Sequence, residues 1–117
     1  MSETFNRVYE IVSAIPRGKV LTYGLISNLM EGRLSAQGVG WALNSLKNSH
    51  SGNNCFNSDN VPWHRVINSK GMISTHKRHE IAPDRQRKLL EAEGVIFEED
   101  RVDLEKYLWK AGLTQFA

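Results

Sequence analysis

Hydrophobic positions in the first half of the chain recur at the spacing of amphipathic helices. In residues 3–15, apolar side chains lie three and four positions apart, which predicts a helix with one buried face that ends at Pro16-Arg17-Gly18. A second helix is expected after Thr22 and a third after Ser35, since each hydroxyl can cap a helix N-terminus. The side chains that the third helix would bury are Val39, Ala42, Leu43 and Leu46.

A short turn with a glycine, residues 31–34, joins the second and third predicted helices. This arrangement is typical of a helix-turn-helix, although most helix pairs with tight turns bind nothing. The outer face of the third helix is small and polar, which would let its backbone approach a DNA duplex closely; it carries Gln37, Gly38, Trp41, Asn44 and Ser45. Trp41 could be exposed on this face or buried in the core, and we expect it to be buried.

The second half begins with an Asn- and Ser-rich segment, residues 48–60, which predicts a flexible surface loop inserted into the domain. The elements expected after it are a turn at 68–71, an extended piece at 72–74, a basic loop at 75–81, a helix from Pro83 that closes at Gly94, a short strand at 95–97 and a short helix capped by Asp103. Repeats and domain boundaries are absent from the sequence, so residues 1–117 are expected to form a single, mainly α domain.

Composition narrows the class of protein. A chain of 117 residues fits one domain, and no apolar run approaches the roughly 20 residues that span a bilayer. The N-terminus lacks a secretory pattern, and the single Cys55 can form neither an internal disulfide nor a thiolate zinc site. We therefore expect an intracellular protein without metal, cofactor or membrane contact.

The distribution of charge suggests a polyanionic partner. The net charge is only +2, yet residues 65–88 carry seven basic side chains against two acidic ones. Such a patch suits nucleic acid. A solvated helix face explains the same charges and remains open at this point.

The densest chemistry lies in Pro62-Trp63-His64-Arg65-Val66, followed by a short apolar stretch, Ser69 and Gly71. This segment resembles Pro-Cys-His-Arg-Val, the active-site motif of O6-alkylguanine-DNA alkyltransferases, with Trp63 in place of the cysteine, as in the alkyltransferase-like proteins. Further matches are Pro16-Arg17-Gly18-Lys19-Val20, Thr22-Tyr23-Gly24, Val39-Gly40, Ala42, Arg85-Gln86, Glu91-Ala92-Glu93-Gly94-Val95, Tyr107 and Trp109. The resemblance covers the chain except for residues 48–60 and the ends.

The resemblance implies a winged-helix-like domain that binds double-stranded DNA through the minor groove and flips O6-alkylguanine out of the duplex. The bound, bent DNA would then be flagged for nucleotide excision repair, whose proteins would be further partners. Alkyl transfer from guanine needs a strong nucleophile such as a thiolate. The indole of Trp63 has no comparable nucleophile but offers an apolar wall and a stacking face, which predicts binding without turnover.

The resemblance also assigns roles to residues. Pro62 and Trp63 would line the lesion pocket, and Tyr23 would push on the phosphate of the target nucleotide to rotate it. Among the motif's neighbours, His64 would hydrogen-bond to Glu93, and Arg65 would brace the fold. Contacts with DNA are expected from Thr22, Tyr23, Arg33, Ser35, Ala36, Gln37, Gly38 and Asn44. For Trp63 and Tyr23, ordinary core and helix-start roles are the alternatives.

Two positions depart from the family pattern. The arginine that normally fills the gap left by the flipped base is replaced by Gln37, and either Gln37 or Arg33 could fill that space. The arginine expected thirteen residues after the tryptophan is replaced by His76, with Lys77 and Arg78 next to it. Which of these three side chains faces the flipped base is open.

Two other functions compete with damage recognition. One is an enzyme, either a methylated-DNA–protein-cysteine methyltransferase that uses Cys55 or a glycosylase, although no base lies near Cys55 in the sequence. The other is a sequence-specific helix-turn-helix regulator. We expect a monomer, nuclear in a eukaryote and otherwise cytoplasmic at the nucleoid.

Overall fold

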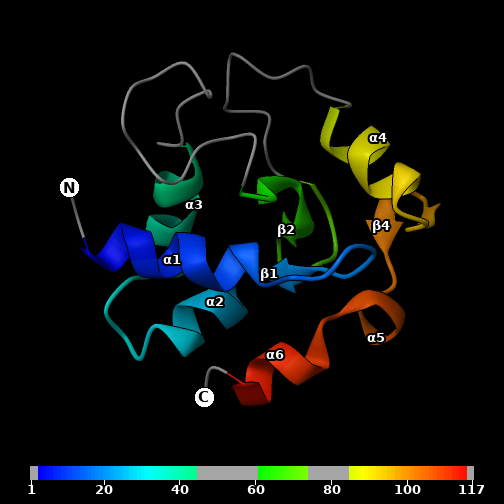
Figure 1. Ribbon diagram of the computed structural model, residues 1–117. Helices are drawn as coiled ribbons and strands as arrows, with labels where there is room; N and C mark the ends of the chain where they lie inside the picture. The colour runs from blue at the N-terminus through cyan, green and yellow to red at the C-terminus, as the bar shows by residue number, and fades with distance from the viewer. Residues whose placement is uncertain (1–2, 45–60, 74–84, 116–117) are drawn as a thin grey trace.

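The computed structural model describes residues 3–44, 61–73 and 85–115 and is mainly helical, as the sequence predicts. In chain order the elements are α1 (Glu3–Ser13), β1 (Leu21–Thr22), α2 (Tyr23–Leu29), α3 (Ala36–Asn44), the 3-10 helix η1 (Trp63–Arg65), β2 (Val66–Ile67), α4 (Arg85–Ala92), β3 (Phe97–Glu98), β4 (Arg101–Val102), α5 (Leu104–Tyr107) and α6 (Lys110–Gln115) (Figure 1). The predictions for Leu46, the loop 48–60 with Cys55, the loop residues 75–81 and Pro83 lie outside the described residues.

Helices α2 and α3 pack against each other and form the predicted helix-turn-helix, and α1 packs against α3. Both predicted caps are present, because Thr22 Oγ1 accepts from the Leu25 amide at 3.1 Å and Ser35 Oγ accepts from the Gly38 amide at 3.1 Å. The turn between the helices reverses the chain through Glu31 and Gly32 in the left-handed region.

The main core lies among these three helices. Tyr9 of α1 is buried, and its hydroxyl donates to the Ala42 carbonyl of α3 at 2.6 Å, which fastens the two helices together. The other buried members of this cluster are Val8, Ile11, Val12, Ile15, Leu21, Ile26, Met30, Val39, Leu43, Val61, Trp63 and Val66.

Two predictions for α3 are wrong. Trp41 is 58 % exposed, since Val39, Ala42 and Leu43 supply the inward face of the helix and Trp41 lies on the other side. Gly38, which we placed on the outer face, is buried, and a Cβ atom there would lie 2.5 Å from Leu34 Cδ1. The glycine thus lets Leu34 pack onto the start of α3.

A small two-stranded parallel sheet connects distant parts of the chain. Strand β1 pairs with β2, with Leu21 opposite Val66, and the residue before it, Val20, bridges to Leu108. The Val20 amide donates to the Tyr107 carbonyl, and the Val20 carbonyl accepts from Trp109, both at 2.9 Å. Because β1 leads directly into α2 and β2 directly follows η1, this pairing joins the helix-turn-helix to the Pro-Trp-His-Arg-Val segment.

The end of α4 follows the predicted pattern. Gly94 adopts a φ of 93°, its amide donates to the Glu91 carbonyl at 3.0 Å, and the Val95 amide donates to the Leu90 carbonyl at 3.1 Å. These bonds form a Schellman cap, which confirms the predicted end at Gly94. The carboxylate of Glu93 is thereby placed at a tightly defined helix end.

The C-terminal part differs in detail from the prediction. The strand expected at 95–97 is β3, which begins only at Phe97 and pairs with β4 in an antiparallel hairpin. Asp103 caps α5 as predicted, because its Oδ1 accepts from the Glu105 amide at 3.1 Å. Helix α6 was not predicted. None of the described helices has the length and apolar character needed to cross a membrane.

Candidate nucleic-acid interface

Trp63 begins η1 and lies in the main core cluster with only 6 % of its surface exposed. Its ring meets the His64 ring edge-on, with centroids 6.0 Å apart, and its amide donates to the Val61 carbonyl at 2.7 Å. Pro62, in front of it, is half-buried, and Tyr23 packs against the same cluster. Pro62 and Trp63 are thus adjacent in the motif, and Tyr23 contacts the same core cluster. Their predicted contacts with a lesion remain predictions.

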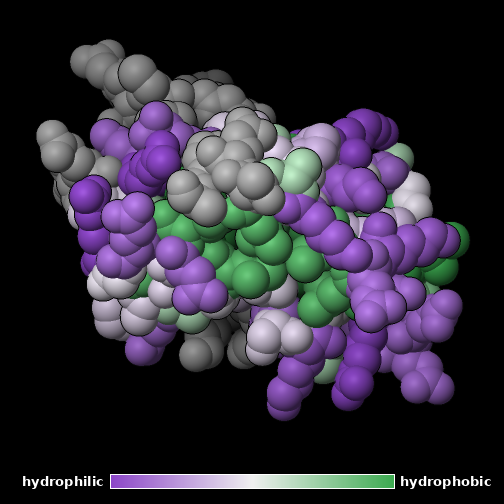
Figure 2. Space-filling view, turned by 90° about the horizontal axis from the view of Figure 1, so that it is seen from below, coloured by the Kyte–Doolittle hydropathy of each residue, from purple (hydrophilic) through white to green (hydrophobic). Residues whose placement is uncertain are grey.

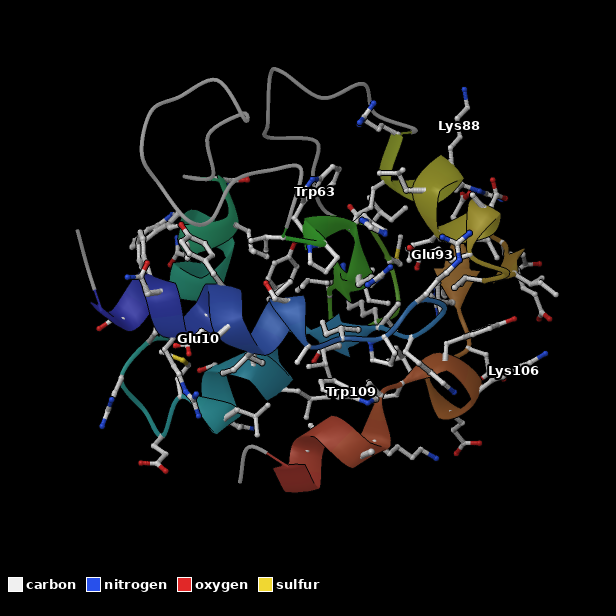
Figure 3. The ribbon with its side chains drawn as sticks, viewed as in Figure 1. Glu10, Trp63, Lys88, Glu93, Lys106 and Trp109 are labelled. Atoms are coloured by element: carbon white, nitrogen blue, oxygen red, sulfur yellow. The ribbon has the colours of Figure 1, made fainter. Side chains whose placement is uncertain are left out.

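Behind Trp63, the predicted hydrogen bond between His64 and Glu93 is present, with 2.8 Å between Nε2 and Oε2 (Figure 3). Arg65 Nη2 donates to the same carboxylate oxygen at 2.7 Å, and Arg65 Nη1 donates to the Ile15 carbonyl at 2.8 Å. The Glu93 side chain, 6 % exposed, thus binds two consecutive motif residues, and Arg65 ties the motif to the end of α1.

The carboxylate is stabilised in its charged form. Burial raises the pKa of Glu93, but the hydrogen bonds from Arg65, the Gly18 amide and His64 outweigh it and lower the pKa to about 2. Burial lowers the pKa of His64 below its usual value of 6.5, in spite of the raising effect of Glu93. Near pH 7 His64 is therefore neutral, and because Glu93 can only accept, the proton of His64 lies on Nε2.

Three residues that support this network were not assigned a role from the sequence. The Gly18 amide donates to Glu93 Oε1 at 3.0 Å, and Arg17 Nη2 donates to the Ala92 carbonyl at 3.0 Å. Gln86 is fully buried, and its Nε2 donates to the carbonyls of His64 at 3.0 Å and Val66 at 2.8 Å. The sequence signal for these residues is the family resemblance, because Arg17 and Gly18 lie in the matching segment Pro-Arg-Gly and Gln86 lies in Arg-Gln.

The predicted DNA-contact residues of the helix-turn-helix fall into three groups: buried, half-buried and exposed. Thr22 is buried and its hydroxyl caps α2, so its side chain is not available to DNA, and Gly38 is buried as described. Tyr23 is half-buried, and its Cε1 atom lies 3.9 Å from the position that a Cβ atom of Gly40 would take, which places its ring beside α3. The remaining predicted residues are exposed: Arg33, Ser35, Ala36, Gln37 and Asn44.

Part of the basic segment 65–88 is used within the protein. Arg65 belongs to the Glu93 network, and Arg87 pairs with Asp100 at 2.7 Å and with Glu91 at 3.3 Å. The exposed cations of this segment in the described part of the chain are Lys70, Arg85 and Lys88, while His76, Lys77 and Arg78 lie outside it. Fewer side chains are thus available to phosphates than the count of seven suggested.

A shallow hollow of about 360 Å³ lies elsewhere, lined by Lys19, Lys106, Trp109 and their neighbours. Figure 3 shows Trp109 and Lys106 on the lower side of the molecule and Trp63 on the upper side. In the view from below, apolar side chains gather in the middle of the face and hydrophilic ones surround them (Figure 2). This hollow is separate from the Trp63 motif and is not the predicted lesion pocket.

Fold and site together define a helix-turn-helix domain whose second half carries a Trp-His-Arg motif braced by a carboxylate. The family model described as "6-O-methylguanine DNA methyltransferase, DNA binding domain" matches residues 3–95. The chain belongs to this family.

Particular relatives refine this assignment. The chain is 41 % identical over 116 residues to Alkyltransferase-like protein 1 of Schizosaccharomyces pombe, covering 94 % of this chain and 97 % of the relative. It is 39 % identical over 106 residues to the DNA base-flipping protein of Escherichia coli, covering 88 % and 71 %. Among solved structures, S. pombe Atl1 in complex with damaged DNA containing O6-carboxymethylguanine matches with a TM-score of 0.75 and 37 % identity, covering 94 % and 97 %. The resemblance to alkyltransferase-like proteins is thereby confirmed.

Proposed function

We propose that the protein recognises O6-alkylguanine in duplex DNA and does not repair it. The observation that carries the proposal is Trp63, which occupies the position of the nucleophilic cysteine while the supporting His64–Glu93 pair is retained. Because the motif position of the thiol holds tryptophan, His64 has no nucleophile there to activate, so the pair holds the motif in place. The similarity to a protein solved with damaged DNA supports the same function.

In this proposal the target base leaves the stack, which costs a few kcal/mol. Tyr23 pushes on the phosphate, Trp63 and Pro62 form the wall that holds the flipped base, and a cation or imidazole among residues 76–78 covers it. Either Gln37 or Arg33, both exposed, fills the space that the base leaves. The bound complex flags the lesion for nucleotide excision repair, in the nucleus or at the nucleoid.

The test of this function is a binding titration with matched duplexes, one with and one without O6-methylguanine. Damage recognition predicts tighter binding to the damaged duplex whatever its flanking sequence, whereas preference for one undamaged sequence would indicate a regulator. A parallel incubation with DNA that carries a labelled methyl group decides the enzymatic alternative. Label on the protein would overturn the proposal.

Replacing Tyr23 by alanine is expected to weaken binding to the damaged duplex about tenfold, because the ring that displaces the phosphate is lost. Flipping should fall in parallel, as measured by 2-aminopurine fluorescence next to the lesion. Tyr23→Phe is the matched control, since it keeps the ring beside Gly40 and should retain most of the affinity. Unchanged lesion affinity in Tyr23→Ala would remove Tyr23 from the site.

A further inference from the structure

Trp41 is a large apolar side chain on the outer face of α3 and is 58 % exposed. Exposure on this scale is unusual for tryptophan, which is highly buried on average. In the described part of the chain, Ile96, at 60 %, is the other large hydrophobic residue with comparable exposure, and it lies next to β3 rather than on the helix-turn-helix. The position of Trp41, rather than its exposure alone, therefore needs an explanation.

The stripe of α3 that carries Trp41 is uncharged. Gln37, Trp41 and Asn44 are all exposed and follow one another at four- and three-residue spacing, so they share one stripe of the helix. Between Ala36 and Asn44 there is no charged residue. A stripe without cations does not attract phosphates, whereas amides and an indole suit the base edges and deoxyribose carbons inside a groove.

Helix α3, which carries this face, packs beside Tyr23. Gly40, the residue before Trp41, lies beside the ring of Tyr23. The helix pair α2 and α3 therefore carries Tyr23, which lies beside Gly40, and the exposed indole of Trp41, which follows Gly40 in the sequence. The related S. pombe chain, which matches over 94 % of this chain, was solved with damaged DNA, and this supports duplex DNA as the occupant.

We propose that Trp41 packs against deoxyribose and base edges in the groove that α3 enters, and so anchors the helix on DNA outside the lesion pocket. This inference rests on the proposed function for the identity of the ligand. Minor-groove proteins use apolar side chains in this way, and an indole offers the largest contact area of any side chain. Trp41 therefore contributes to binding of damaged and undamaged duplexes alike, whereas Trp63 acts on the damaged base.

The experiment compares Trp41→Ala with the unmodified protein on damaged and undamaged duplexes at several salt concentrations. Trp41→Ala is expected to bind both duplexes about tenfold more weakly and to leave their affinity ratio unchanged. The dependence of log Kd on log salt should stay the same, because no cation is removed. Trp41→Phe should lose less than about threefold, since it keeps an aromatic ring.

Ile96→Ala is the matched control, because it removes an equally exposed apolar side chain away from α3 and should not change either affinity. Circular dichroism checks that each variant is folded. Unchanged affinity of Trp41→Ala for both duplexes would overturn the inference, as would a dimer of the unmodified protein that Trp41→Ala separates in sedimentation. If the unmodified protein does not prefer the damaged duplex but Trp41→Ala still weakens binding, the proposed function fails and this inference stands.

Discussion

Replacing Trp63 by alanine is expected to lower the affinity for a duplex with O6-methylguanine about thirtyfold more than the affinity for the undamaged duplex. The physical reason is that the flipped base would lose the aromatic wall on which it stacks, while the contacts of α3 with the groove persist. Fluorescence anisotropy with both duplexes measures the two affinities. Because Trp63 is 6 % exposed, the variant should also lose about 3 kcal/mol of unfolding free energy, so the folded fraction must be measured in parallel.

Two further variants separate the site from the core. Trp63→Phe keeps a flat apolar face and should retain part of the preference for damage. Trp109→Phe makes the same change on the lower side of the molecule and should leave the preference unaltered (Figure 3). Equal losses on both duplexes in Trp63→Ala would mean that Trp63 is only a core residue.

Glu93→Gln is expected to reduce the free energy of unfolding at pH 7 by about 3 kcal/mol. The size follows from the pKa of Glu93, which falls from 4.5 to about 2 on folding, at about 1.4 kcal/mol per unit. The substitution leaves the Arg65 guanidinium without its counter-charge and weakens the support of the Trp63 motif. Urea denaturation measures the loss.

The pH dependence gives a second measurement. A carboxylate whose pKa is lowered by folding stabilises the fold above pH 4.5, and this stability is lost as the pH falls from 4.5 towards 2. The lowered pKa of His64 acts in the same direction below pH 6.5, because the unfolded chain binds that proton more readily. In Glu93→Gln, the loss of stability between pH 4.5 and pH 2 should therefore disappear.

Glu91→Gln is the matched control for this network. Glu91 lies in the last turn of α4, two residues before Glu93, and pairs with Arg87 at 3.3 Å, but both side chains are substantially exposed. An exposed ion pair contributes less than about 1 kcal/mol, so this variant should remain close to the unmodified protein. A similar loss in Glu91→Gln and Glu93→Gln would contradict the special role of the buried carboxylate.

Local features of the sequence were sufficient to predict the helices α1 to α5 and several of their ends, although not α6. The caps by Thr22, Ser35 and Asp103 each involve an amide no more than three residues away, and the glycine end of α4 depends on backbone conformation at one position. Such short-range interactions leave a direct pattern in the sequence.

The long-range features could not be predicted from periodicity. Leu21 pairs with Val66, and Val20 pairs with Leu108. The local sequence of each segment does not indicate which distant segment it pairs with. The bond between His64 and Glu93 was expected only through the family resemblance, since nothing in the spacing of the two residues indicates it. Trp41 was misplaced because the general tendency of tryptophan to be buried outweighed its position on the helix.

The parallel pairing of β1 with β2 has a mechanical consequence. Tyr23 follows β1 without a spacer, and the η1 turn with Trp63 precedes β2 without one, so neither segment can shift without disturbing the other. In the proposed function, strain produced where Trp63 holds the flipped base would be transmitted through this pairing to Tyr23 at the phosphate. Extraction of a base and its inspection would then be one coupled movement rather than two successive events.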